Sequence, residues 1–158
     1  MRTTILLAAA FVSVSAAGVL AQGKDVFKYT SPADVDAAMQ KHNADTGQAT
    51  SSIARYADFS GVQVDRNKSG RVEIHDKWAD FIVVLAGKAT FTIGGTVTGK
   101  VVNGAPANGE WFADSSSGGK VYDMVPGATF IVPAGTPHWM QVPAGGHIQY
   151  IAFKHPAS

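Results

Sequence analysis

The arrangement of apolar and polar residues changes character partway along the chain. From Ile53 onward, short runs either alternate between apolar and polar side chains or are continuously apolar, and glycine-rich turns separate them, as is typical of β-strands. The clearest runs are "RVEIH", "DFIVVLAG", "KATFTIGG", "ATFIVPAG" and "HIQYIAFKH". Many short strands of this kind predict an antiparallel barrel or sandwich.

One helix is predicted before the strands. "SPADVDAAMQKHNAD" starts with Ser31 as an N-cap and Pro32 at the first helical position, and an apolar stripe at helical spacing follows. We expect the helix over residues 32–45, within an N-terminal extension of residues 22–60. The barrel itself is expected over residues 61–155.

Polar stretches outside the strands are predicted to be loops and exposed ends. "GQATSSI" is expected to be a loop, as is the glycine-rich stretch of residues 103–120. Trp111 and Phe112 would clamp that second loop onto the barrel, or stack on a sugar or aromatic ligand. The remaining histidines are expected to lie outside the site. We expect His42 to be a solvated residue at the end of the helix, His147 to be a hairpin residue and His155 to be a solvated residue of the C-terminal tail.

The N-terminal residues predict export. Arg2 supplies a positive charge, residues 5–21 are apolar and rich in alanine, and Val19 and Ala21 place small residues at the −3 and −1 positions. This pattern is typical of a signal peptide over residues 1–21, so we expect a periplasmic or secreted protein with no membrane span after cleavage. An uncleaved membrane anchor is the competing interpretation, but the run is shorter than the roughly 20 apolar residues of a span.

The charge and composition of the chain argue against nucleic-acid binding, binding to an anionic membrane surface and a thiolate metal site. The chain has 13 Lys and Arg against 12 Asp and Glu, and the two signs are equal in number once Arg2 is removed. It has no basic stripe of the kind that binds nucleic acid or an anionic membrane surface. It also has no cysteine, which excludes a thiolate metal site, so a hydrophobic core with or without a metal must hold the fold together.

Two separate segments contain side chains that can bind a metal. Glu73 and His75 are two residues apart, so they lie on the same face of a strand, and a bend at "DKWA" would bring Asp80 beside His75. In the second segment, a proline and a glycine in "VPAGTP" stop strand pairing and fix where His138 emerges. A carboxylate such as Asp80 facing an apolar interior needs compensation, which it would obtain from a divalent ion, from a turn or from Lys77.

These two segments resemble the conserved motifs of the cupin superfamily. "EIHDKWADFIVVLAG" keeps the spacing of the first motif, which runs His-x-His, four residues, Glu, six residues and Gly, with Glu73 at the first histidine and Asp80 at the glutamate. "GATFIVPAGTPHWMQV" ends in Val142 where the second motif has asparagine. It matches that motif at four fixed positions, which are Gly127, Pro133, Gly135 and His138. The resemblance covers residues 62–154 and implies an all-β fold, a small antiparallel cupin barrel of the jelly-roll type with one short N-terminal helix.

Carried over to this chain, the resemblance implies that His75, Asp80 and His138 bind one divalent metal ion inside the barrel. Two histidines and one carboxylate suit Fe(II), and Mn(II) and Zn(II) are alternatives. The carboxylate of Asp80 makes Cu(II) a less favoured ion, although copper remains an alternative.

The role of Glu73 has two alternatives. It is either a fourth, oxygen ligand, which would favour harder metals, or the partner of a cation such as Arg66 or Arg71. Gln149 and Tyr150 point to opposite faces of the last strand, so one of them must enter the barrel and is available to orient a substrate or a water molecule.

Two functions remain open at this stage. The resemblance implies a metalloenzyme acting on a small oxygen-rich molecule or a sugar, with metal-dependent oxidoreductase, lyase or isomerase chemistry. The alternative is a non-catalytic module that binds or senses a metal or a ligand. The rest of the barrel is expected to be lined by apolar side chains, with no dedicated general base, and the resemblance also implies a homodimer.

Overall fold

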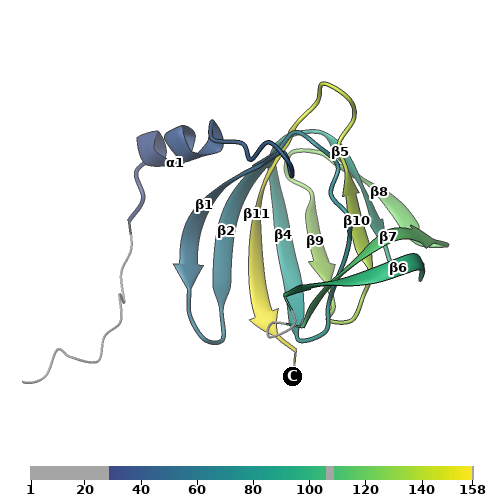
Figure 1. Ribbon diagram of the computed structural model, residues 1–158. Coiled ribbons are helices and arrows are strands. Elements are labelled where there is room, and N and C mark those ends of the chain that lie inside the picture. Colours follow the sequence, from purple (N-terminus) through teal and green to yellow (C-terminus); the bar gives the residue numbers. More distant parts are fainter. Residues whose placement is uncertain (1–28, 106–108, 158) are drawn as a thin grey trace, which may run out of the picture.

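Two antiparallel β-sheets curl around a common interior in the computed structural model, which describes residues 29–105 and 109–157 (Figure 1). The strands are β1 (Gln48–Arg55), β2 (Ser60–Arg66), β3 (Val72–His75), β4 (Trp78–Gly87), β5 (Ala89–Ile93), β6 (Thr96–Ala105), β7 (Glu110–Ser117), β8 (Lys120–Met124), β9 (Thr129–Val132), β10 (His138–Gln141) and β11 (Ile148–Pro156). One sheet has the order β1-β2-β11-β4-β9 and the other β6-β7-β3-β10-β5-β8. The predicted all-β fold of antiparallel strands with one short N-terminal helix is confirmed.

The core lies between the two sheets. Successive side chains of a strand point to opposite faces, so every second residue of β4 faces inward, and Ile82 and Val84 are buried while Phe81 is exposed. Residues from both sheets complete the core, including Val64, Phe91, Met124, Met140 and Ile148. Burial of this apolar surface is the main force that holds the two sheets together.

The corner at the end of β4 requires glycine, as the sequence predicts. Gly87 has a φ of 77°, a conformation that other residues rarely adopt. A Cβ atom built on Gly87 would lie 2.1 Å from the carbonyl oxygen of His147. Any side chain at residue 87 would therefore prevent the backbone just before β11 from packing against the end of β4.

The helix α1 (Pro32–Met39) is shorter than the predicted span of residues 32–45. After the helix, the side-chain Oδ1 of Asn43 accepts hydrogen bonds from the backbone N–H groups of Asp45 (2.9 Å) and Thr46 (3.0 Å). An asparagine that satisfies backbone donors in this way favours a turn over a continued helix.

Both stretches predicted to be loops contain strands, so these predictions were wrong. "GQATSSI" lies mostly within β1, and much of residues 103–120 forms β7, which pairs with β6 and with β3. Trp111 and Phe112 therefore belong to a strand beside the site-forming strand β3. The error has a physical reason: these strands carry serine and threonine on exposed faces, so no apolar alternation marks them.

A hydrogen-bond network around Asp65 ties the segment after α1 to the first sheet. Asp65 is only 5% exposed. Its carboxylate accepts hydrogen bonds from Gln149 Nε2 (2.7 Å), and contacts His42 Nε2 (2.9 Å) and His147 Nδ1 (3.2 Å). The prediction of a solvated His42 was therefore wrong, and His147 has a structural role besides its place in the hairpin. Burial opposes the charge of Asp65, but these hydrogen bonds outweigh it and lower the pKa.

Two predictions are not tested by this part of the chain. The signal peptide of residues 1–21 lies outside the described residues, so export stays a prediction. No helix in the described residues is long and apolar enough to cross a membrane. The homodimer also stays a prediction.

Replacing Asp65 with asparagine should lower the free energy of unfolding at pH 7 by about 1–3 kcal/mol, the usual cost of disrupting a buried hydrogen-bonded group. The pKa of Asp65 is lowered in the folded state, so its stabilisation is complete above the unfolded value of 3.8 and is lost as the pH falls through the folded pKa. Urea unfolding should therefore show a difference between wild type and Asp65→Asn that stays constant from pH 7 to about pH 5 and shrinks as the pH falls below 3.8. The exposed Asp36→Asn on α1 is the control, and a difference independent of pH would contradict the assignment.

Candidate metal centre

The candidate metal ligands come from both sheets. Glu73 and His75 lie on β3 and His138 begins the neighbouring strand β10, where it is the cross-strand partner of Glu73. Asp80 lies on β4 of the other sheet, with its side chain facing the interior. The four residues predicted from the two sequence segments are therefore brought together where the two sheets face each other.

A tight turn fixes the position of His138. Gly135 has a φ of 75°, and its N–H donates a 2.8 Å hydrogen bond to the backbone oxygen of His75. The N–H of Thr136 bonds to the oxygen of Pro133 across the same turn (3.2 Å). The turn that precedes one histidine is thus tied directly to the backbone of the other, which explains why proline and glycine are needed at these positions.

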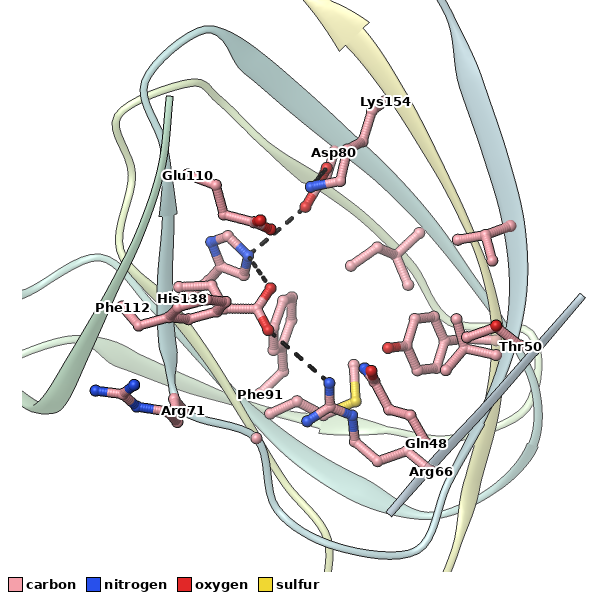
Figure 2. A pocket seen from close by; sticks show the side chains of 17 residues that line it. Gln48, Thr50, Arg66, Arg71, Asp80, Phe91, Glu110, Phe112, His138 and Lys154 are labelled. Atoms are coloured by element: carbon pink, nitrogen blue, oxygen red, sulfur yellow. Dashed lines mark ion pairs between the residues drawn. The ribbon is translucent and has the colours of Figure 1, made fainter. Parts of the chain in front are cut away.

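The ligand atoms converge on one point. Glu73 Oε2 lies 3.6 Å from His75 Nε2 and 3.8 Å from His138 Nε2. Asp80 Oδ2 lies 3.3 Å and 3.6 Å from the same two nitrogen atoms. The ligand atoms of Glu73, His75 and His138 all lie within 4.8 Å of one another. Figure 2 shows His138 and Asp80 directed toward the same part of the cavity.

These separations fit a bound divalent ion. Metal–ligand bonds of about 2.1 Å place neighbouring ligand atoms about 3.0 Å apart in an octahedron and about 3.4 Å apart in a tetrahedron. The imidazole–carboxylate distances of 3.3 to 3.8 Å lie close to these values. Two imidazoles with carboxylate oxygens suit Fe(II), Mn(II) or Zn(II).

The orientation of His138 also suits a metal ligand. Its Nδ1 lies 3.1 Å from the backbone oxygen of Thr136, so Nδ1 carries the proton and Nε2 presents its lone pair to the cluster. The ring is 6% exposed and packs edge-on against Phe91, with ring centroids 5.8 Å apart. Burial lowers the pKa of His138 although Glu73 and Asp80 oppose the shift, so the imidazole stays neutral near pH 7.

Solved structures with a related fold include several enzymes. The polyketide cyclase RemF from Streptomyces resistomycificus matches with a TM-score of 0.54 and 17% identity, over 84% of this chain and 80% of that one. An oxalate oxidase in complex with the substrate analogue glycolate matches with a TM-score of 0.54 and 14% identity, over 87% of this chain and 62% of that one. An RmlC-like cupin from Shewanella frigidimarina NCIMB 400 matches with a TM-score of 0.52 and 15% identity, over 73% of this chain and 82% of that one.

The chain has a cupin fold. No protein-family model and no curated protein sequence matches it. At these identities the likeness shows the fold alone, and the chain spans less than two thirds of the oxalate oxidase. The chemistry of this protein must therefore be argued from its own residues.

Lys154 is a member of the cluster that the sequence analysis missed. Its Nζ lies 3.2 Å from Asp80 Oδ1 and 2.6 Å from His75 Nε2. Lys154 lies on β11 directly opposite Asp80 on β4. The alternation along β11 was the available signal, because Tyr150 and Ala152 face the interior and Lys154 continues that series. The cation beside Asp80 is therefore Lys154, and not Lys77, which was the predicted alternative.

His75 and Lys154 face each other inside the cluster. The 2.6 Å between Lys154 Nζ and His75 Nε2 is a hydrogen-bond distance, so one of the two nitrogen atoms donates and the other accepts. Burial disfavours a charge on His75, but the Asp80 and Glu73 carboxylates outweigh it and raise the pKa of His75 to about 9. The same carboxylates that hold a proton or an ammonium group here would hold a metal ion.

Glu73 lies where it could serve in both of the roles that the sequence left open. Its Oε2 faces the two histidines, and its Oε1 lies 3.8 Å from Arg66 Nη2. Arg71 is instead paired with Asp114 (3.2 Å) and lies over the ring of Phe112. Burial opposes the charge of Glu73, but the histidines and Arg66 lower its pKa.

A cavity of about 370 Å³ adjoins the cluster, and its lining is more polar than predicted. Ile82, Phe91 and Met140 supply an apolar wall, as expected. The cavity also holds charged and polar side chains, which are Gln48, Arg66, Arg71, Glu110, Tyr150 and Lys154. Of the two last-strand residues, Tyr150 enters the barrel and Gln149 bonds to Asp65 on the outer side. Only the tertiary structure shows this second set of polar groups.

Replacing Lys154 with methionine should destabilise the metal-free protein and strengthen metal binding. Asp80 would lose the Lys154 ammonium group at Oδ1 and keep only His75 beside Oδ2, at a cost of up to about 3 kcal/mol in the free energy of unfolding. A metal ion would no longer compete with the ammonium group, so its affinity should rise by about tenfold or more, equivalent to at least about 1.4 kcal/mol. Urea unfolding after chelation and a zinc competition titration measure the two effects.

The matched control for that experiment is Lys77→Met, since Lys77 is exposed and belongs to the turn before Asp80. It should change neither quantity. Weaker zinc binding in Lys154→Met than in wild type would contradict competition, and would mean that Lys154 supports the metal site.

Proposed function

We propose that this cupin is a metal-dependent enzyme that acts on a small oxygen-bearing organic molecule, with oxidoreductase or lyase chemistry. The observation that carries the proposal is the convergence of His75, His138 and Glu73, with Asp80 beside them, on the wall of a cavity of about 370 Å³. A site made of side chains on one wall of a cavity leaves the opposite side free for a substrate.

The position of the ligands favours catalysis over a structural role. Structural metal sites are closed by four protein ligands, whereas catalytic sites keep a coordination position open toward a cavity. Here Glu73, Asp80 and His138 all line the cavity, so an ion bound among them would face it. The fold is shared with proteins described as a polyketide cyclase and an oxalate oxidase, which is consistent with an enzyme but does not select the reaction.

The residues around the site have definable roles in such a reaction. A bound divalent ion would act as a Lewis acid or a redox centre toward an oxygen atom of the substrate. Ile82, Phe91 and Met140 would exclude water from the reacting group. Tyr150 would orient the substrate, because burial raises its pKa to about 12 and the hydroxyl therefore keeps its proton as a hydrogen-bond donor.

A non-catalytic binding module is the second candidate, and one observation favours it. The ammonium group of Lys154 already neutralises Asp80 and contacts His75. A cupin whose internal lysine holds this position would bind a metal weakly and release it readily, as a sensing protein would require. The two candidates differ in metal content and in the coordination of the bound ion.

Purified protein should retain about one equivalent of divalent metal, and His138→Ala should lose most of it, because removal of one imidazole breaks the donor set and leaves a cavity in its place. Elemental analysis of both proteins, before and after reconstitution, is the measurement. His147→Ala is the control, since His147 is a histidine that contacts Asp65 outside the cluster. Absence of metal from wild type after reconstitution would exclude the enzyme and leave the binding module.

The metal-loaded protein should also show an open coordination position. With Co(II) as a spectroscopic substitute, addition of azide should change the visible absorption spectrum, because an exogenous anion can enter a position that no side chain fills. A Co(II) spectrum that azide leaves unchanged would indicate a closed site. That outcome would replace the enzyme with a structural or storage role.

A further inference from the structure

Arg66 is a buried cation on the wall of the cavity, away from Asp80 and Lys154. It ends strand β2, where Val62, Val64 and Arg66 form the inward-facing series. Only 6% of Arg66 is exposed. Figure 2 shows Arg66 and Gln48 on one side of the cavity, with Asp80 and Lys154 on the opposite side. An arginine at this depth requires partners for its donors.

One edge of the Arg66 guanidinium lacks such partners. The Nε atom is buried and has no hydrogen-bond partner among the described residues. The nearest carboxylate oxygen to Nη2, Glu73 Oε1, is 3.8 Å away, which is too long for a hydrogen bond. The Nε and Nη2 hydrogens point in the same direction and form the edge that binds a carboxylate through two parallel hydrogen bonds.

The backbone beside Arg66 is shaped to hold the guanidinium in place. A Cβ atom built on Gly70 would lie 2.3 Å from Arg66 Nη1, so a side chain at this position would displace the guanidinium. Tyr150, which is buried, lines the same cavity and supplies a second polar group. Gln48, the cross-strand partner of Arg66, also lines the cavity.

With a metal ion bound, the charged side chains of the cavity would favour an anionic ligand beside Arg66. Without a metal, the cations Arg66 and Lys154 face the carboxylates of Glu73 and Asp80, and Glu110 also lines the cavity. A divalent ion held by Glu73 and Asp80 would occupy these two carboxylates and leave the Arg66 guanidinium without an anionic partner of its own. Glu73 stands between the two regions, with Oε1 toward Arg66 and Oε2 toward His138, so a ligand anchored at Arg66 would extend toward the metal ligands.

We propose that Arg66, with Tyr150 and Gln48, is the anchor for the carboxylate group of a small organic acid. This inference rests on the proposed function for the reaction, but the anchor itself is a property of Arg66 and can be tested without turnover. A carboxylate satisfies the planar two-donor edge, and the apolar wall of Ile82 and Met140 accommodates a short hydrocarbon segment between the anchor and the metal ligands. The volume of about 370 Å³ limits the acid to a few carbon atoms or a single small ring.

Calorimetric titration with a fixed panel of probes tests the proposal. The panel is acetate, glycolate, succinate and benzoate, with glycolamide as the neutral analogue of glycolate and inorganic phosphate as a different anion. It is run on zinc-loaded and on chelated protein. At least one carboxylate should bind to the zinc-loaded protein at least tenfold more tightly than glycolamide and phosphate. Equal binding of the neutral analogue, preferred binding of phosphate, or no binding of any carboxylate would overturn the proposal.

Three variants assign the binding to Arg66. Arg66→Met should abolish the preference for carboxylates, and Arg66→Lys should recover only part of it, because an ammonium group keeps the charge but loses the two-donor edge. Gly70→Ala keeps the arginine and displaces its guanidinium, so it should weaken carboxylate binding at least fivefold even if Arg66→Met fails to fold. Arg71→Met is the control, because Arg71 also lines the cavity but is paired with Asp114. Full carboxylate binding in Gly70→Ala and Arg66→Lys would contradict the anchor.

Failure of the anchor and failure of the proposed function give different results. If the metal is bound with an open position but no carboxylate preference depends on Arg66, the anchor is wrong and the proposed function stands. If no metal is bound but the Arg66-dependent preference persists in the chelated protein, the anchor stands and the protein is a binding module for small organic acids.

Discussion

The central constraint on this structure is the presence of two carboxylates against the interior of an apolar barrel. Asp80 is nearly inaccessible to water, and Glu73 is partly so. A carboxylate in such surroundings keeps its charge only if a cation or several donors compensate it. His75, Lys154 and Arg66 are arranged around the two acids, and their positions follow from this need. The chemistry of the site follows as well, because the same electrostatic attraction that holds an ammonium group would hold a metal ion.

The barrel meets this constraint by supplying the charges from different sheets. One sheet provides Glu73, His75 and His138, and the other provides Asp80, Lys154 and Arg66. Charged groups that face each other across the interior cannot relax outward without separating the sheets, so the packing of the core holds them in position. The turn at Gly135 adds a direct backbone link between the segments of the two histidines. Rigid placement of this kind is what a metal site needs.

Lys154 and Arg66 divide the cavity into two functional regions. At the first, Lys154 contacts Asp80 and His75 and would compete with a metal ion for them. At the second, Arg66 presents an unsatisfied donor edge that would recognise an anionic group. Glu73 contacts both regions. A ligand would therefore be bound at one end and would meet the metal ligands at the other, which is the arrangement expected of an enzyme acting on one functional group of a small acid.

The sequence by itself determined the all-β class, the turn glycines and the candidate metal ligands, because strand alternation and the spacing around Pro133 and Gly135 are local properties of the chain. It also determined that Glu73 and His75 share a face. Only the tertiary structure decided that β7 is a strand, since its serine-rich faces carry no apolar pattern. Only the tertiary structure placed Lys154 opposite Asp80 and Arg66 near Glu73, because these pairs depend on which strands are neighbours, and strand order is set by the packing of the whole barrel.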